Sequence, residues 1–168
     1  MRERAIMIEI RAIQEKDYPE VARIWRDVLD IPVTDECLAE TYAKMGKDDR
    51  YATFVAEEGG RVVGLVTTVV CLAIGHPRGY TKINGLGVLP EHRGKGIGRM
   101  LIEKDEEIAK VNGTMYLGLA SGLQRETAHA FYEHMGYQKT SYWFRKKALG
   151  IYLPTPANSC QMLFNSAS

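Results

Sequence analysis

A glycine-rich segment in the middle of the chain has the composition of an anion-binding loop. It reads Leu86-Gly87-Val88-Leu89-Pro90-Glu91-His92-Arg93-Gly94-Lys95-Gly96-Ile97-Gly98 and runs from a predicted strand into a predicted helix. Gly94, Gly96 and Gly98 leave backbone N–H groups free to point at a phosphate, and the following helix adds unpaired amides and the positive end of its dipole. Arg93 and Lys95 add positive charge beside it. These residues predict a site for a phosphate-bearing ligand.

Three other interpretations of the segment fit less well. A Walker P-loop requires Ser or Thr after Gly-Lys, but Gly96 follows Lys95, so nothing is placed to hold Mg²⁺. A Rossmann fingerprint requires glycine where Arg99 stands and an acidic residue at the end of the next strand, where Leu117-Gly118-Leu119-Ala120 offers none. A plain strand-to-helix turn does not need three glycines flanked by two cations.

The loop resembles a known signature. Arg93-Gly94-Lys95-Gly96-Ile97-Gly98 is similar to the Arg/Gln-x-x-Gly-x-Gly/Ala motif of the GNAT acetyltransferases, which in that family binds the coenzyme A diphosphate, and it matches every fixed position. Downstream, Ala128-His129-Ala130-Phe131-Tyr132-Glu133-His134-Met135-Gly136-Tyr137 looks like the family's second motif, a helix bearing a tyrosine before a Gly-aromatic pair. The resemblance extends from about Ile8 to Lys147. It implies an α+β, GNAT-like fold, a mixed but mostly antiparallel sheet with helices on both faces, and acetyl-CoA (coenzyme A) as cofactor.

The resemblance also implies where the cofactor binds. The strand ending Leu86-Gly87-Val88 is expected to splay from its neighbour and to lend backbone hydrogen bonds to the pantetheine arm. Gly85 and Gly87 agree with this because glycine in a strand permits close approach of a ligand, although a simple bulge or bend is the alternative. The predicted cofactor-binding residues are Leu86, Gly87, Val88, Arg93, Gly94, Lys95, Gly96, Ile97 and Gly98.

Tyr132 is the predicted catalytic residue. When an amine attacks a thioester the leaving group is a thiolate, and a phenol with a pKa near ~10 can donate a proton to it. The resemblance places Tyr132 at that sulfur. The alternative is that Tyr132 is only a core aromatic beside Phe131, because a helix places only one of two adjacent residues fully inward.

No general base is evident. Some family members carry a glutamate on the strand before the loop, but here that strand reads Tyr80-Thr81-Lys82-Ile83-Asn84-Gly85 and has no carboxylate. Asn84 could orient a water, and His76 or Glu36 could approach from loops, although each is equally an ordinary surface or helix residue. Arg125 stands where many relatives have asparagine.

These residues need a scaffold, and the apolar pattern predicts one. Helical spacing predicts helices from Tyr18 to about Ile31, from Thr34-Asp35 to Gly46, from Ile97 to Val111 and from Thr127 to Met135. Strands are expected over Ile6 to Ala12, Tyr51 to Ala56, Val62 to Leu72, Tyr80 to Leu89, Met115 to Leu119 and Tyr137 to Lys147, with a hairpin turn at Gly59-Gly60 and a loop from Ala73 to Gly79. We therefore expect one GNAT-like domain over residues 1–147. Residues 148–168 form a C-terminal tail of unclear structure, which includes a candidate strand at Met162 to Phe164.

Composition excludes several functional classes. The 22 basic and 21 acidic residues leave a formal charge of +1, so nucleic acid is not an expected partner. The longest apolar stretch, Val62 to Gly75, falls short of the ~20 residues that cross a bilayer, and the charged N-terminus is not a signal peptide, so we expect a cytoplasmic protein without a membrane partner. Three cysteines, Cys37, Cys71 and Cys160, are far apart and are expected to be reduced, with no metal site.

The sequence predicts an N-acetyltransferase that transfers acetyl from acetyl-CoA to a primary amine of a small molecule, an amino acid or a protein. Direct attack in a ternary complex is preferred because no cysteine lies in a nucleophile motif. The alternatives are an acyltransferase with another acyl-CoA or acceptor, and a non-catalytic acyl-CoA-binding module. A homodimer is a further expectation, since members of the family often dimerise. The tail could take part by pairing with an exposed sheet edge of another chain.

Overall fold

The core of the protein is one five-stranded sheet in the order β1-β2-β3-β4-β5. The computed structural model describes residues 7–144. β1 (Ile8–Ala12), β2 (Tyr51–Glu58), β3 (Arg61–Ala73) and β4 (His76–Val88) pair in antiparallel fashion, and β5 (Leu117–Leu119) joins β4 in parallel. The predicted α+β class with a mixed, mostly antiparallel sheet is confirmed.

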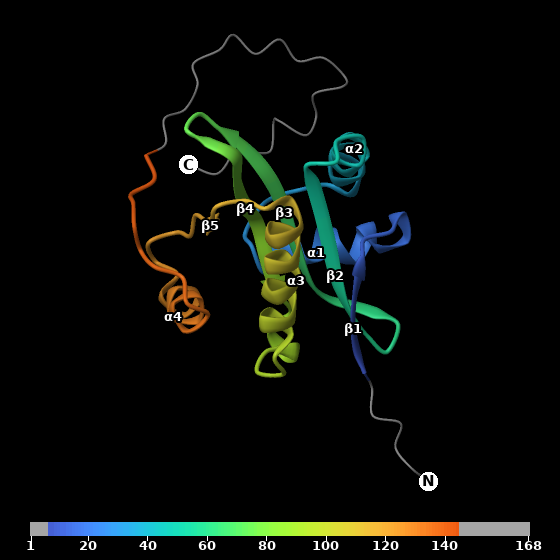
Figure 1. The fold of residues 1–168 in the computed structure, drawn as a ribbon. Helices are drawn as coiled ribbons and strands as arrows, with labels where there is room; N and C mark the ends of the chain where they lie inside the picture. Colours follow the sequence, from blue (N-terminus) through green and yellow to red (C-terminus); the bar gives the residue numbers. More distant parts are fainter. Residues whose placement is uncertain (1–6, 145–168) are drawn as a thin grey trace.

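Helices cover both faces of this sheet, as Figure 1 shows. α1 (Tyr18–Asp27) and α2 (Asp35–Met45) bury one set of side chains with Val55, Leu65 and Leu89. α3 (Ile97–Asn112) and α4 (Glu126–His134) bury another set with Val63, Val66 and Ile83. Neighbouring residues of the central strands β2 and β3 therefore point into two separate apolar cores, one on each side of the sheet.

The helix boundaries follow local chemistry. Thr34 caps α2, since its Oγ1 accepts a hydrogen bond from Cys37 N at 3.1 Å, as predicted. Asp17 precedes α1 but does not cap it; its carboxylate instead accepts hydrogen bonds from Arg11 and from Gln14 N. Gly113 ends α3 with a φ of 62°, in the left-handed region.

Several expectations are wrong. The segment from Ala73 to Gly79 is no loop, because β3 and β4 continue to a tight turn at Ile74-Gly75. Residues 137–144 form no strand, and residues 145–147 lie outside the described part, as does the whole predicted tail of 148–168. Cys37 is disulfide-bonded rather than reduced, whereas Cys71 is free. No helix within residues 7–144 is long and apolar enough to span a membrane.

Candidate active site

β4 and β5 separate partway along β4. β5 pairs only with Thr81, Lys82 and Ile83. From Gly85 to Val88, β4 remains paired with β3 on its other side, opposite residues 67 to 64. Along this stretch no described strand covers the second edge of β4, which leaves alternate backbone N–H and C=O groups for a ligand to pair with. We refer to this opening between β4 and β5 as the strand fork.

A bulge lies at the start of the fork. The β3–β4 register shifts where Thr67 faces Gly85 and Thr68 faces Ile83, so Asn84 is the extra residue. A bulge bends a strand and re-aims the side chain at that point. Asn84 is exposed and lines the cavity described below.

Gly85 and Gly87 are explained by packing against α1. A Cβ on Gly85 would lie 2.3 Å from Trp25 Cη2, and one on Gly87 would lie 2.8 Å from Ile24 Cγ2. The space that glycine leaves here is therefore filled by two side chains of α1. Packing against α1 is therefore a sufficient reason for both glycines, and the close approach of a ligand to this strand stays a prediction that rests on its open backbone edge.

The glycine-rich loop has the backbone that an anion site requires. Gly94 and Gly96 have φ values of 78° and 81°, and a Cβ on either would meet nothing within 4 Å, so conformation rather than space demands glycine. Gly96 is the N-cap of the 16-residue α3 and no side chain caps this end. Free amides and the helix dipole therefore face the loop, which suits a diphosphate.

The cations beside the loop are held in different ways. Lys95 Nζ donates to both carboxylate oxygens of Glu58 at 2.9 and 3.0 Å, and His92 Nδ1 also contacts Glu58. Lys95, and then His92, hold the pKa of the Glu58 carboxyl below its usual range, partly offset by desolvation. Arg93 is exposed and donates through Nε to Val88 O at 3.2 Å. Lys95 is thus tethered through its side chain, while its backbone remains part of the loop.

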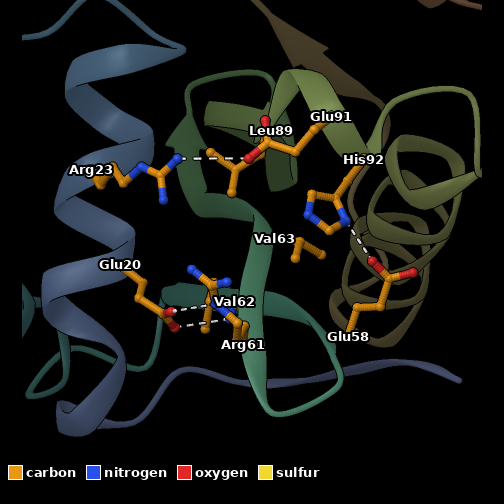
Figure 2. A pocket seen from close by; sticks show the side chains of 9 residues that line it. All are labelled: Glu20, Arg23, Glu58, Arg61, Val62, Val63, Leu89, Glu91 and His92. Carbon is orange, nitrogen blue, oxygen red and sulfur yellow. Dashed lines mark hydrogen bonds and ion pairs between the residues drawn. The ribbon is translucent and has the colours of Figure 1, made fainter. Parts of the chain in front are cut away.

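A ring of ion pairs anchors the base of the loop. In Figure 2, side chains from α1, from the β2–β3 hairpin and from the turn after β4 surround a small cavity of about 70 Å³. Its ion pairs are Glu20–Arg61 at 3.9 Å, Arg23–Glu91 at 3.7 Å and Glu58–His92. Every charged side chain among the described residues that line this cavity has a partner. These ion pairs therefore position the loop, and the cavity does not offer a second binding site.

A second cavity, of about 140 Å³, lies in the strand fork. α1 and the segment after it supply an apolar wall, β4 supplies the fork backbone, and the segment from β5 to α4 supplies the opposite wall. Its lining residues are Trp25, Leu29, Ile31, Ile83, Asn84, Gly85, Leu86, Leu119, Ala120, Ser121, Arg125 and Tyr132. We call it the fork cavity.

Tyr132 and Phe131 point to different neighbours. Phe131 packs on α3, where a Cβ on Gly98 would lie 3.2 Å from Phe131 Cζ, whereas Tyr132 lines the fork cavity. The hydroxyl of Tyr132 has no hydrogen bond to another residue in the described range. Burial raises the pKa of Tyr132 above its ordinary value, and the charge of Arg125 offsets part of this. The phenol is therefore protonated at neutral pH and can donate.

No carboxylate of residues 7–144 lines the fork cavity. His76 lies at the start of β4, Glu36 is exposed in the first turn of α2, and neither reaches the cavity wall. Within residues 7–144 there is also no cluster of metal-ligating side chains. Of the candidates for handling a proton from the acceptor, only Asn84 lies at the site.

Sequence reasoning missed Trp25 and Ser121. Trp25 lies within the predicted helix from Tyr18 to about Ile31 and belongs to no motif, but its side chain lines the cavity and its indole N–H donates to Tyr42 Oη at 3.4 Å. Ser121 follows β5 without any motif, yet its hydroxyl is buried and has no partner within the described part of the chain. The one sequence signal for the position of Trp25 was the glycine at position 85, which leaves room on the strand for a large side chain from the helix.

Known proteins share both sequence and fold with this chain. Residues 9–137 match the family model described as "Acetyltransferase (GNAT) family". The chain is 27% identical to the aminoalkylphosphonate N-acetyltransferase of Salmonella typhimurium, over 82% of this chain and 90% of that protein. It is 30% identical to rat N-acetyltransferase family 8 member 2 over 69% of this chain, but it spans only 54% of that relative's length.

A solved structure extends the comparison. The aminoglycoside N-acetyltransferase AAC(6')-Iy, in complex with CoA, aligns with a TM-score of 0.75 over 88% of this chain and 100% of that chain, at 15% identity. This likeness shows the common fold. Because the family model covers most of the chain, including the glycine-rich loop and Tyr132, the chain belongs to the GNAT family of acetyltransferases, an enzyme family whose cosubstrate is acetyl-CoA.

Proposed function

We propose that this protein transfers the acetyl group of acetyl-CoA to a primary amine by direct attack in a ternary complex. The observation that carries the proposal is the placement of two sites along one strand. The glycine-rich loop follows one end of the open edge of β4, and Tyr132 lines the cavity at the other end. A ligand with an anionic end, an extended arm and a reactive end fits that order.

The loop and the open edge fit the parts of coenzyme A. Backbone N–H groups from Gly94 to Gly98, together with the N-terminus of α3, would hold the diphosphate. The open edge at Leu86, Gly87 and Val88 would pair with the amides of the pantetheine arm, as an added strand does. Acetyl-CoA supplies the acetyl group as a thioester, and the chain's own residues place that thioester in the fork cavity.

Tyr132 is proposed to act as the general acid. The amine nitrogen forms a bond to the acetyl carbon, the carbon–sulfur bond breaks, and the Tyr132 hydroxyl gives its proton to the departing sulfur. The acceptor amine loses its proton to water, which Asn84 can orient from the bulge of β4, and the Tyr132 phenolate takes a proton back from water before the next turnover. None of the described residues that line the fork cavity is a cysteine, which favours direct attack over a covalent enzyme intermediate.

One observation favours a second candidate, a non-catalytic acyl-CoA-binding module. Within the described part of the chain no carboxylate lines the fork cavity, so none of these residues offers the amine a strong base. A binder and an enzyme differ in turnover, and a transferase for another acyl-CoA differs in its donor preference.

Thermal unfolding with acetyl-CoA, coenzyme A and ATP, followed by thiol release, tests the proposal. A ligand at a hundred times its dissociation constant that binds only the native state adds roughly 2.7 kcal/mol to the free energy of unfolding. We expect a clear rise in Tm with both coenzymes and none with ATP. Amine-dependent release of the coenzyme A thiol then identifies an enzyme; a Tm rise without release with any amine or donor identifies a binder, and no Tm rise refutes both.

A further inference from the structure

Among the described residues, one full charge lines the fork cavity, that of Arg125, and it is positive. The polar side chains of the cavity are Asn84, Ser121, Arg125 and Tyr132, and no acidic residue is among those that line it. A cavity lined by charge of one sign concentrates ligands of the opposite sign, and Arg125, which is exposed, supplies that charge here. An acceptor with several positive charges would meet repulsion here and find no carboxylate to pair with.

The guanidinium of Arg125 has no ion pair or hydrogen bond to another described residue. Most other arginines in the same range are engaged by carboxylates. These pairs are Arg11 with Asp17 and Glu57, Arg23 with Glu91, Arg26 with Asp35, Arg50 with Asp48 and Arg61 with Glu20. Arg125 therefore keeps its planar set of donors for a ligand, and that set matches a carboxylate or a phosphate in bidentate geometry.

The wall that carries Arg125 is held in place. His129 Nε2 donates to Gly122 O at 2.9 Å, and the backbone N–H of Arg125 donates to the same carbonyl at 3.0 Å. These bonds tie the segment after β5 to the first turns of α4. The buried hydroxyl of Ser121 lies on the same wall without a partner in the described residues. A buried polar group without a partner is costly, so a ligand that bonds to it gains more than one at an exposed group.

The opposite wall is apolar. Trp25, Leu29 and Ile31 line it, and the Trp25 ring is fixed by its bond to Tyr42, whose hydroxyl is in turn 3.1 Å from Thr67 Oγ1. A short carbon skeleton can pack against this wall. The cavity thus offers one anionic subsite, one apolar surface, and Tyr132 at the reacting end.

We propose that the acceptor is a small primary amine that also carries an anionic group, a carboxylate or a phosphate, bound by Arg125 with the Ser121 hydroxyl. This inference rests on the proposed acetyl transfer and names its substrate class. Arg125 acts as a specificity-determining residue: it binds the end of the acceptor that does not react and leaves the amine directed toward the acetyl group. Its positive charge also disfavours the protonated amine nearby, which favours the nucleophilic form where no carboxylate base lines the cavity.

The test compares amines of similar size that differ in charge. The full chain is assayed for thiol release with acetyl-CoA and β-alanine, O-phosphoethanolamine, ethanolamine or 1,3-diaminopropane. We expect kcat/KM to be at least about 10-fold higher for an anionic amine than for ethanolamine, and lowest for the diamine, as a charge-assisted bond predicts. The first two amines distinguish a carboxylate acceptor from a phosphate acceptor.

Arg125→Gln should remove this preference. We expect kcat/KM for the anionic amines to fall by about 10- to 100-fold, that for ethanolamine to change by less than about 3-fold, and the KM for acetyl-CoA to stay constant. Arg125→Lys should restore part of the loss, because it keeps the charge but loses the bidentate geometry. Arg50→Gln, an exposed arginine that pairs with Asp48 and lines neither cavity, is the matched control and should change none of these values.

Two outcomes overturn the inference. One is an equal loss for charged and neutral amines in Arg125→Gln, or a raised KM for acetyl-CoA, which would assign Arg125 to the cofactor. The other is a wild-type preference for ethanolamine or the diamine. If no amine is acetylated, calorimetry of β-alanine and O-phosphoethanolamine with the coenzyme A complex decides: binding that Arg125→Gln abolishes supports the anionic subsite although transfer has failed, and no binding refutes both.

Discussion

Tyr132 shows how one side chain is selected for chemistry among several similar ones. Three aromatic residues meet at α4 and the turn after it: Tyr132, and Phe131 and Tyr137, whose ring centroids lie 5.5 and 5.8 Å from that of Tyr132. Of the three, only Tyr132 lines the fork cavity. All three pack against the core on the α3 side, so the place that Tyr132 alone takes in the cavity wall is what distinguishes it.

Tyr132→Phe should lower kcat without changing the binding of acetyl-CoA. A positioned general acid contributes typically ~10²–10⁴-fold, so we expect kcat to fall by about 100-fold and the KM for acetyl-CoA to stay within about 2-fold. Initial rates of thiol release with saturating amine measure both. Tyr137→Phe is the control, because that hydroxyl is buried without a described partner and does not line the cavity; equal rates for wild type and Tyr132→Phe would contradict the assignment.

The same phenol sets the pH dependence. Burial raises the pKa of Tyr132, so the proton that it donates is present throughout the range in which enzymes are assayed. The acceptor amine must instead be deprotonated. We therefore expect kcat/KM to rise with pH and to level off above the pKa of the amine. A profile recorded from pH 6 to 9.5 with one amine should show this rising limb and no decline. A decline centred near pH 7 to 8 would mean that another group donates the proton.

At the scale of elements, the loop between β4 and α3 depends on backbone conformation. Gly94 has a φ of 78° and open space around it, so Gly94→Ala costs on the order of 1 kcal/mol through its left-handed conformation alone. Relief of that strain would turn the loop amides away from the anion. We expect a modest drop in Tm and loss of most of the stabilisation that acetyl-CoA provides, measured by thermal unfolding with and without the coenzyme.

Gly75→Ala provides the matched control for this prediction. Gly75 has a φ of 87°, and a Cβ there would also meet nothing within 4 Å, but it lies in the β3–β4 turn. The strain is therefore similar and the location is different. Gly75→Ala should lower Tm to a similar extent and keep the full response to acetyl-CoA. If the two variants respond alike, the loop amides do not bind the coenzyme.

The predicted elements differ from the observed ones where contacts between separate segments of the chain decide the structure. The helices and the first five strands follow from apolar spacing, caps and turns, and the glycine-rich loop follows from its motif. The length of β4 does not follow from these patterns. Glycine is needed at Gly79 because a Cβ there would lie 1.9 Å from Cys71 O, and the sequence cannot show this close approach of the two strands. Residues 137–144 have strand-like composition but pair with no described strand, and Trp143 instead packs beneath Lys82 Nζ at 4.9 Å.

At the scale of the whole molecule, the sheet brings its two faces together at one place. Trp25 comes from α1 on one face and Tyr132 from α4 on the other, yet both line the fork cavity. A continuous sheet would separate them, and only where β4 and β5 part can both faces reach the same space. This explains why the motifs predicted Tyr132 but not Trp25 or Ser121: their shared position depends on the point at which two strands stop pairing.

The sheet also buries one acid that the proposed chemistry does not use. Asp105 lies on α3, fully buried, and neither carboxylate oxygen has a hydrogen-bond partner within the described residues. Desolvation raises the pKa of Asp105 from 3.8 to about 7. A folded pKa above the unfolded one means that the folded state holds the proton more tightly, so stability declines as pH rises from about 4 to 7 and the full penalty remains above pH 7.

Asp105→Asn should therefore stabilise the protein in a pH-dependent way. The asparagine resembles the protonated acid, so we expect little change at pH 4.5 and a gain at pH 8 of at most on the order of 4 kcal/mol, the energy that corresponds to the raised pKa. Urea unfolding at the two pH values measures the difference. Glu103→Gln, an exposed acid on the same helix, should show no such dependence. A loss of stability at pH 8 would mean that the ionised carboxylate of Asp105 has a stabilising partner, and that the interior beneath α3 is polar rather than apolar.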